Sequence, residues 1–326
     1  MSEDNPGGAR RSDLEDLNAR FGALDGIAFR DIGDGIVVAD VSNASASASF
    51  CMQGAHLLSW TPRTQREPVV WVSDAARYAK GKAVRGGIPV CWPWFGPHPT
   101  DPAAPSHGYV RAAAWTLAAV ELLPGGDTRV SFERVDDASS RRYGPHSFAL
   151  SLRATIGAEL AVELETTNRG ASAFSITEAL HTYLAVDDIG DIAVAGLDGA
   201  TYVDQVDAGR RKRCEGDVRF AGEVDRVFVG TTATCVVEDP GFGRRIVVEK
   251  SGSRSTVVWS PWLEKARRLG DLGEGRRALG GWREMLCVET ANALDDVVAI
   301  APGATHRMGL RLRVEARAPT RESSAG

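Results

Sequence analysis

The sequence lacks the segments by which proteins are exported or anchored in a membrane. Its N-terminus, MSEDNPGGARRSDLEDL, is charged and glycine-containing, whereas a signal peptide has an apolar stretch of roughly 7–15 residues there. The most apolar window, residues 112–123, is interrupted by Thr116 and Glu121 and falls short of the ~20 residues that span a bilayer. We therefore expect a soluble, cytoplasmic protein that makes no contact with a membrane.

Paired cysteines and an excess of basic residues are also missing. The five cysteines are an odd number and form no C-x-x-C pair, which is typical of reduced thiols in a cytosol. They are Cys51, Cys91, Cys214, Cys235 and Cys287. With 38 Lys and Arg against 43 Asp and Glu, the net charge is −5, so no general basic field is present to hold a phosphate backbone. We expect no nucleic-acid partner.

Several cofactor and nucleophile motifs are absent. The chain has no G-x-x-x-x-G-K-[ST] loop and no G-x-S-x-G turn, which removes the main support for a phosphate-loop NTPase or a common serine hydrolase. Gly273-x-Gly275-x-x-Ala278 follows a charged stretch and not an apolar strand, so it does not indicate a dinucleotide site. The six histidines show no local metal-binding spacing, so only residues distant in the sequence could form a metal site. We expect neither a cofactor nor a metal.

What the sequence does contain is a long series of short apolar runs. Of the 326 residues 43% are hydrophobic, enough for one large core. The runs are rich in β-branched residues, are separated by Gly, Pro, Asn or Ser, and several alternate strictly between apolar and polar positions. They predict strands at 36–41, 48–52, 56–60, 69–72, 115–122, 128–135, 148–155, 159–167, 234–239, 244–250, 256–260, 285–290 and 308–314.

The connections between these runs decide the fold class. No helical pattern long enough for a parallel crossover separates the predicted strands, which argues against a doubly wound sheet. We therefore predict an all-β fold, a large antiparallel sandwich with few short helices. Ser12-x-x-Glu15 has capping-box spacing and predicts a short helix at 12–21 within a polar N-terminal tail, residues 1–24. The remainder divides into a single domain, residues 25–315, and a C-terminal tail, residues 316–326.

The segment KGKAVRGGIPVCWPWFGPHP, residues 80–99, cannot be an ordinary strand throughout because prolines interrupt it. Two interpretations fit. As a ligand site, its glycines would allow close backbone approach, Arg85 would offer a planar fork to a phosphate or a pair of hydroxyls, and its tryptophans would suit the apolar face of a sugar ring. As a structural loop, its aromatic side chains would fill the core and its lysines would face water. The segment alone slightly favours the structural loop.

Four further residues are candidates for chemistry, each with a structural alternative. His107 lies beside a glycine and is either a hydrogen-bonded loop residue or a ligand contact. His181 shares a strand face with Tyr183 and is either a buried imidazole or part of a concave surface. Glu289 ends an otherwise apolar strand, where a carboxylate either reaches water or performs chemistry. Asp225 is either a turn residue or a ligand acceptor.

Taken in order along the chain, these segments resemble the hexose-6-phosphate mutarotase family, also called glucose-6-phosphate 1-epimerase, within the galactose-mutarotase-like group of aldose 1-epimerases. The similarity covers most of residues 50–290. Its motifs are GAHLLSW (54–60), VRGGIPVCWPWFG (84–96), SHGYVR (106–111), ALHTYL (179–184), GLDGATYVDQV (196–206), EVDRVF (223–228), VVWSPWLEKA (257–266) and CVET (287–290).

The resemblance implies a sugar site on a concave sheet face and interconversion of the α and β anomers of a phosphorylated hexose. It implies that His181 is the general acid and Glu289 the general base. Arg85, Asp225 and His107 would contact the substrate. With ordinary pKa values near 4.3 for Glu and 6.5 for His, neutral pH supplies a carboxylate and some imidazolium.

The reaction expected from the resemblance needs no cofactor, metal or covalent intermediate, and its partner is a small sugar phosphate bound by a monomer. For the phosphate we rank Arg85 above Lys82, because Arg offers bidentate donors. Two alternatives remain. An aldose 1-epimerase for neutral sugars would use the same acid and base, and a carbohydrate-binding sandwich without catalysis would share the fold.

Overall fold

The alternating segments form the longest sheet of the protein. The computed structural model describes residues 8–317, with side chains from Asp13 onward. Nine antiparallel strands lie in the order β16-β13-β18-β19-β23-β9-β8-β7-β6. Their bounds are β6 Thr116–Leu122, β7 Thr128–Val135, β8 Phe148–Ile156, β9 Leu160–Asn168, β13 Ala193–Ala195, β16 Val218–Arg219, β18 Cys235–Asp239, β19 Arg244–Ser251 and β23 Thr305–Ala316. Along β8 and β9 buried and half-buried residues alternate without a break, as expected of a sheet with one face in the core.

An eight-stranded sheet carries the candidate residues on its strands. Seven strands run in the order β15-β14-β17-β20-β21-β11-β5, and β12 also pairs with β21. Their bounds are β5 Val90–Cys91, β11 Glu178–Leu180, β12 Tyr183–Ala185, β14 Thr201–Asp204, β15 Arg210–Arg213, β17 Val224–Val229, β20 Ser255–Ser260 and β21 Met285–Asn292. Strand β21 is buried along its whole length, because neighbours cover both of its edges and both of its faces.

The remaining elements complete the second layer and its surroundings. A four-stranded sheet in the order β1-β2-β3-β4 and a pair β10-β22 flank the eight-stranded sheet. The bounds are β1 Ile27–Asp31, β2 Val37–Ser42, β3 Ala46–Cys51, β4 His56–Pro62, β10 Phe174–Ile176 and β22 Val298–Ile300. The two α-helices of the described residues are α1 Gly8–Phe21 and α2 Trp262–Leu269, and short 3₁₀ turns occur at Val110–Ala112, Arg141–Tyr143, Ile189–Asp191 and Gly281–Glu284.

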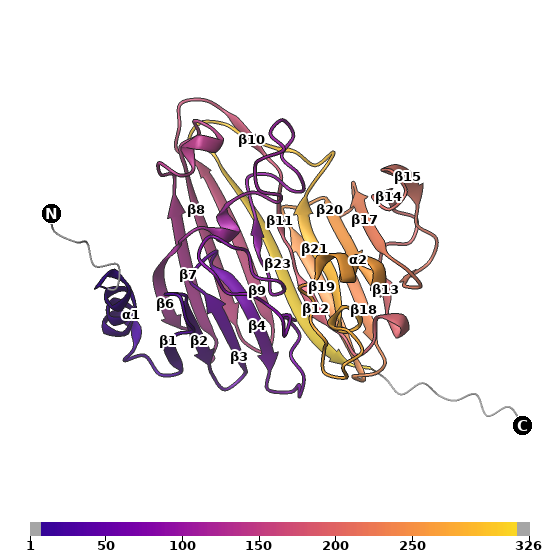
Figure 1. Ribbon diagram of the computed structural model, residues 1–326, viewed down its shortest axis with the longest axis horizontal. Helices are drawn as coiled ribbons and strands as arrows, with labels where there is room; N and C mark the ends of the chain where they lie inside the picture. Colours follow the sequence, from indigo (N-terminus) through magenta and orange to yellow (C-terminus); the bar gives the residue numbers. More distant parts are fainter. Residues whose placement is uncertain (1–7, 318–326) are drawn as a thin grey trace, which may run out of the picture.

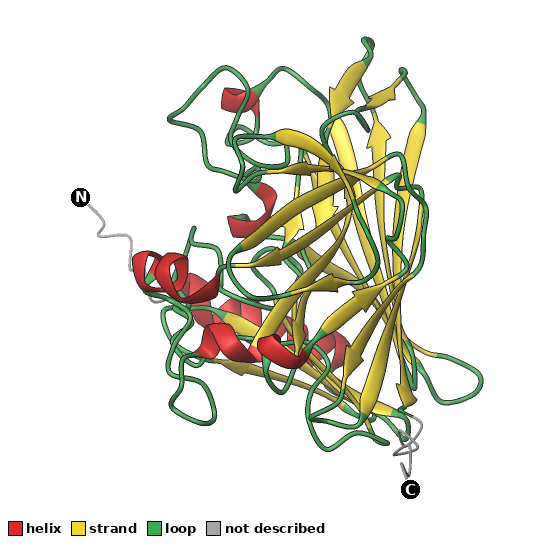
Figure 2. Cartoon of the chain, turned by 90° about the vertical axis from the view of Figure 1, so that its right-hand side faces the viewer, coloured by secondary structure: helices red, strands yellow, loops and turns green. Residues whose placement is uncertain are grey.

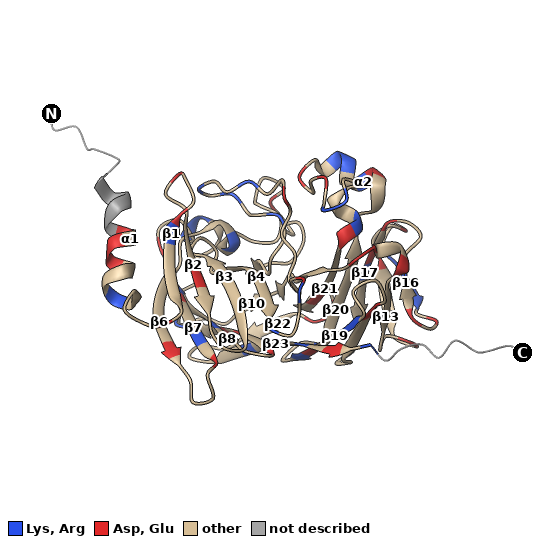
Figure 3. Ribbon diagram, turned by 90° about the horizontal axis from the view of Figure 1, so that it is seen from below, with Lys and Arg blue, Asp and Glu red and all other residues tan. Residues whose placement is uncertain are grey.

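The sheets stack as a two-layer sandwich. In Figure 1 the nine-stranded sheet runs across the molecule, with β1–β4 over one half of it and β11, β20 and β21 over the other half. Figure 3 shows the same layers on edge, with α2 above β17, β20 and β21, on the side away from the nine-stranded sheet. The helices and many of the long loops lie to the left of the sandwich in Figure 2. The predicted antiparallel sandwich with few helices is therefore confirmed.

Three local expectations differ from the structure. Residues 69–72 form no strand and make only isolated bridges, Val70 with Leu184 and Val72 with Gly86, because the two bridges go to different segments of the chain. Helix α1 begins at Gly8, four residues before the expected start, and the Ser12 side chain lies outside the described residues. Strand β23 continues to Ala316, one residue beyond the predicted end of the domain. Residues 318–326 of the predicted tail lie outside the described chain.

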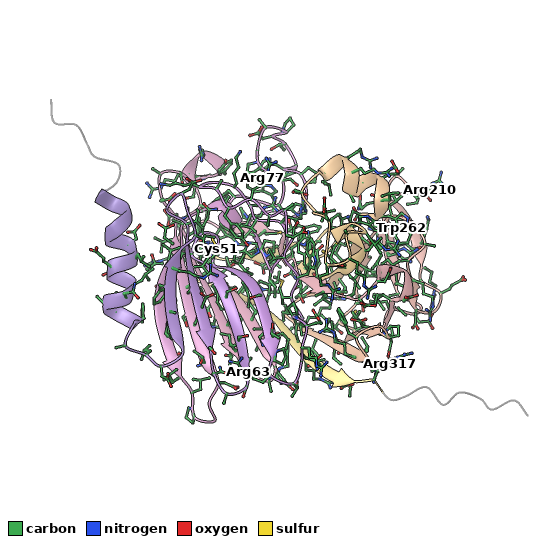
Figure 4. All side chains as sticks on the ribbon, turned by 60° about the horizontal axis from the view of Figure 1, so that its bottom comes forward. Cys51, Arg63, Arg77, Arg210, Trp262 and Arg317 are labelled. Atoms are coloured by element: carbon green, nitrogen blue, oxygen red, sulfur yellow. The ribbon has the colours of Figure 1, made fainter. Side chains whose placement is uncertain are left out.

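All five cysteines are buried and unpaired, as their spacing predicts. In Figure 4, Cys51 lies in the half of the molecule that holds β1–β4, whereas Trp262, at the start of α2, lies in the other half. Among residues 8–317, no helix is both long enough and apolar enough to cross a membrane.

A buried arginine of the nine-stranded sheet holds the loop that leads toward the candidate site. Arg244 of β19 is 1% exposed and lies 3.4 Å from the carboxylate of Asp239, which is fully buried. Its guanidinium also donates to the main-chain carbonyls of Glu67, Pro68 and Ala185. One side chain thereby connects the nine-stranded sheet to the loop at Glu67 and Pro68 and to the end of β12 in the eight-stranded sheet.

Replacing Asp239 with alanine leaves the Arg244 charge buried beside carbonyls alone. Loss of one member of a buried ion pair typically costs about 3–5 kcal/mol. We expect the free energy of unfolding of Asp239→Ala, measured by urea denaturation, to fall by about 3 kcal/mol. The exposed pair Arg311–Glu159 is the control. Glu159→Gln should change the free energy of unfolding by less than about 0.5 kcal/mol. Equal losses in the two variants would contradict this account of Arg244.

Candidate active site

The register of four strands places a row of side chains across the eight-stranded sheet. Asp225 of β17 lies opposite Trp259 of β20, Trp259 lies opposite Cys287 of β21, and Cys287 lies opposite Tyr183 of β12. Residues directly opposite one another project from the same face of a sheet. Glu289 follows Cys287 by two positions and therefore joins this face.

This face points away from the interior of the sandwich. Asn292 of β21, which has the opposite parity to Glu289, reaches His306 of β23 in the nine-stranded sheet, at 3.2 Å. On the other face, Asp225 lies 3.6 Å from Lys265 of α2, and α2 lies on the outer side of the sheet (Figure 3). The row therefore opens outward, beneath α2 and the loops.

His181 and Glu289 meet on this outer face. His181 follows the end of β11 and stacks on Tyr183, with ring centroids 4.8 Å apart and planes 12° apart. Its Nε2 lies 3.4 Å from Oε1 of Glu289, although 108 positions separate the two residues in the chain. The expected shared face of His181 and Tyr183 is confirmed by this stacking. The structure thus brings together the two residues that were predicted to carry the acid–base chemistry.

Burial opposes charge on both members of this pair. Burial lowers the pKa of His181 well below its usual value, and His107, Arg111 and Arg85 lower it further. Burial raises the pKa of Glu289 well above its usual value, and the negative charge of Asp225 adds to this. Burial therefore favours neutral imidazole and protonated carboxyl, whereas ordinary pKa values predict a carboxylate and some imidazolium.

Arg85 reaches the same face from the irregular segment before β5. Its Nε lies 3.1 Å from both carboxylate oxygens of Asp271, and its Nη1 donates to the Tyr183 hydroxyl at 2.9 Å. Burial lowers the pKa of Arg85, but Tyr183 and Asp271 outweigh this effect, so the guanidinium stays charged. Its Nη2 has no hydrogen-bond partner within residues 13–317, which leaves one edge of the fork for a ligand.

The two glycines after Arg85 serve packing inside the protein. Gly87 has φ +71°, and a side chain there would collide with the imidazole of His56 and the carbonyl of Leu57. His56 is fully buried with Nε2 2.8 Å from the Gly86 carbonyl, and burial lowers the pKa of this imidazole to about 4. These contacts fix the backbone that presents Arg85.

His107 stands beside the acid–base pair. Its ring centroid lies 5.6 Å from that of His181, and Phe95 packs edge-on against it at 4.8 Å. The Gly96 N–H points at Nδ1 from 3.3 Å, which assigns the ring proton to Nε2. Burial, with Arg111 and Arg85 adding to it, lowers the pKa of His107 to about 3. His107 is therefore a neutral donor and acceptor at the site.

Asp225 lies within strand β17 and is not a turn residue. Burial raises the pKa of its carboxyl, against the influence of Lys265. Lys265 itself bonds Glu223 at 2.6 Å, so α2 supplies one ammonium to two carboxylates at the rim of the site.

Other residues of the segment 80–99 lie elsewhere. Lys82 is exposed on a turn whose backbone is bonded to the side chain of Gln53, and within the described chain no hydrogen bond or ion pair of its ammonium is seen. Trp92 is buried against Phe148, with ring centroids 4.4 Å apart, and Trp94 is also buried. These tryptophans fill the core, as the structural interpretation of the segment predicts.

The sequence interpretation missed several members of the site. Trp259 and Tyr183 form its aromatic walls, with ring centroids 6.1 Å apart. Asp271 is the charged partner of Arg85, and Lys265 is that of Asp225. Only Tyr183 carried a local signal, its alternation with His181. Trp259 and Lys265 lie in the segment 257–266 that carries the family resemblance, but strand pairing and the return of α2 and its loop bring them and Asp271 to the site, and no local pattern encodes this.

Comparisons with known proteins show the family of the chain. Residues 38–313 match the sequence model of the family described as aldose 1-epimerase. The chain belongs to the aldose 1-epimerase family. It is 36% identical over 254 residues to a protein of Salmonella typhimurium, covering 78% of this chain and 82% of the relative, and 31% identical over 265 residues to one of Cenchrus ciliaris, covering 78% of each. Both relatives bear the name "Putative glucose-6-phosphate 1-epimerase".

Solved structures of other proteins share the fold of the epimerase. A crystal structure titled "putative mutarotase (YeaD)" from Salmonella typhimurium aligns with a TM-score of 0.83 at 31% identity, covering 90% of this chain and 95% of that chain. A galactose mutarotase-like protein from Clostridium acetobutylicum shares the fold, with a TM-score of 0.69 at 12% identity over 89% of this chain and 98% of that chain.

The protonation states of the buried histidines can be measured by NMR. A lowered pKa keeps an imidazole neutral until the pH falls through the lowered value. We therefore expect the imidazole ¹⁵N shifts of His56, His107 and His181 to remain those of neutral rings at pH 5, where an ordinary histidine with a pKa near 6.5 is protonated. The urea-unfolded chain is the control and should titrate normally. A folded-state His181 that titrates near 6.5 would refute the assigned charge states.

Proposed function

We propose that this epimerase interconverts the α and β anomers of glucose 6-phosphate, with His181 and Glu289 as its acid–base pair. The observation that supports this most strongly is the approach of the two side chains to 3.4 Å on the outer face of the sheet. Mutarotation needs one group to remove the proton of the anomeric hydroxyl and another to protonate the ring oxygen. A histidine and a carboxylic acid side by side supply both.

The neutral form and the ionised form of the pair differ by the transfer of one proton from Glu289 to His181. Neutral His181 with protonated Glu289 holds the same number of protons as imidazolium with carboxylate, so the resting form and the ionised form differ only in where the proton lies. In the ionised form, Glu289 accepts the proton of O1 while His181 donates to O5, and the C1–O5 bond breaks to give the open aldehyde. Rotation about C1–C2 presents the other face, and closure returns both protons.

Arg85 is the proposed phosphate ligand, because its Nη2 edge is available while Asp271 and Tyr183 hold its other nitrogens. Arg presents paired donors that suit phosphate oxygens. His107 and Asp225 lie where they can hydrogen-bond the sugar hydroxyls. The named relatives support a phosphorylated substrate.

A neutral-sugar epimerase is the second candidate, because the acid–base pair would act on an unphosphorylated aldose in the same way. The two candidates differ only in whether Arg85 contributes to binding, so each experiment uses glucose and glucose 6-phosphate in parallel.

Substitution of the acid–base pair is the direct test. His181→Ala and Glu289→Gln should each reduce enzyme-catalysed anomer exchange of glucose 6-phosphate by about 10²–10⁴-fold, the usual contribution of a positioned acid or base. Magnetisation-transfer NMR measures the exchange at equilibrium. Glu249→Gln, half-exposed on the nine-stranded sheet, is the matched control and should keep the wild-type rate. Folded Glu289→Gln protein with wild-type exchange would disprove the assignment.

Replacing Arg85 with methionine separates the two candidate substrates. Loss of a charge-assisted bond of about 1.5–3 kcal/mol should raise the KM for glucose 6-phosphate by about 10- to 100-fold and leave that for glucose nearly unchanged. Lys82→Met should have a smaller effect, since its ammonium is solvated, and Arg311→Met, on the other sheet, should have none. An equal rise for both sugars in Arg85→Met would favour the neutral-sugar epimerase.

A further inference from the structure

The acid–base pair has a third neighbour that mutarotation does not use. Cys287 lies opposite Tyr183 and two positions before Glu289, on the same face of β21, and it is fully buried. The ligand atoms offered by His181, Cys287 and Glu289 all lie within 4.8 Å of one another. One nitrogen, one sulfur and one oxygen donor therefore converge from two strand segments that are distant in the sequence.

The distance between the nitrogen donor of His181 and the oxygen donor of Glu289 suits a tetrahedral divalent cation, and the sulfur donor of Cys287 lies within 4.8 Å of its two partners. With bond lengths of about 2.0–2.3 Å to N, O and S, tetrahedral zinc places its ligand atoms about 3.3–3.7 Å apart. The distance from His181 Nε2 to Glu289 Oε1 is 3.4 Å, within that range. Three protein ligands also leave a fourth position open, here toward the outer face of the sheet.

An unsatisfied polar atom marks the same place. Glu289 Oε2 is buried and has no hydrogen-bond partner among the described residues, and Glu289 is only 1% exposed. A buried polar atom without a partner is costly, so a ligand that supplies one is favoured. Asp225 on the same row adds a further negative charge near Glu289.

We propose that His181, Cys287 and Glu289 form a binding site for a thiophilic divalent cation of the Zn²⁺ class, whose occupation switches the enzyme off. On coordination the thiol proton and the carboxyl proton leave to solvent, and the bound metal stabilises the resulting anions. An imidazole and a carboxylate that ligate a metal can neither donate nor accept the protons of a sugar. The inhibition rests on the proposed acid and base, whereas the binding itself does not.

Cobalt(II) is the probe, because a thiolate ligand gives it a near-ultraviolet charge-transfer band and tetrahedral coordination gives intense visible bands. We expect one equivalent of Co²⁺ to produce both, and Zn²⁺ to displace it. Cys287→Ser should abolish the charge-transfer band and weaken binding by at least about tenfold. Cys235→Ser, which removes a buried thiol of the nine-stranded sheet, should leave the spectrum unchanged. Glu289→Gln provides a second variant and should also weaken binding.

The outcomes separate this proposal from the proposed function. Zn²⁺ should inhibit anomer exchange, a chelator should restore it, and Cys287→Ser should require at least about tenfold more Zn²⁺. Wild-type protein without a charge-transfer band, or a band that persists in Cys287→Ser, would overturn the metal site even if exchange is catalysed. Cobalt bands in a protein that exchanges no sugar would leave the metal site standing and remove the proposed function.

Discussion

Strand β21 is hydrogen-bonded on both edges, to β20 on one side and to β11 and β12 on the other. That register places Cys287 and Glu289 on the outer face and Leu286 and Val288 in the interior. A slip of one residue would exchange the two faces and bury Glu289 inside the sandwich. Because both faces of β21 are buried and distinct, the register has little freedom. The position of the carboxylate, its distance from His181 and the field around it all follow from this pairing.

A second His–Glu pair joins the inner face of this sheet to the nine-stranded sheet, and the contrast shows what the outer face contributes. Glu178 of β11 lies opposite Asn292 and contacts His306 of β23 at 3.2 Å, which links the two layers. Burial raises the pKa of Glu178, as it does that of Glu289. Only the pair His181–Glu289, however, lies on the outer face with Arg85 close by. Similar groups therefore hold layers together on one face and, as we propose, move protons on the other.

Burial of the acid–base pair costs stability that a polar surface position would not. A neutral imidazole beside a protonated carboxyl limits that cost, because neither side chain then carries a charge in its buried position. The surrounding charged groups have partners close by: Arg85 pairs with Asp271, and Lys265 contacts both Glu223 and Asp225. The site can then take up the charge of a substrate without reorganising a distant network.

The long strands of the nine-stranded sheet are predictable from the sequence, because β7, β8 and β9 have one wet face and their alternation is visible. Strands of two to four residues, such as β5, β11 and β15, are too short to show a period. Glu289 stood out as an acid in an apolar run, and His181 as an imidazole on the face of Tyr183. Asp271 and Lys265 could not be found, since a returning loop and helix α2 bring them to the site. Resemblance to a family supplied the roles that local patterns left open.

The measurement that tests the central claim most directly is a crystal structure of the Glu289→Gln protein soaked with glucose 6-phosphate. The account predicts that the anomeric hydroxyl and the ring oxygen lie within about 3 Å of His181 and residue 289, with the phosphate on the Nη2 edge of Arg85. A sugar bound on the outer face with its C1 turned away from both side chains, or bound on another surface, would contradict it.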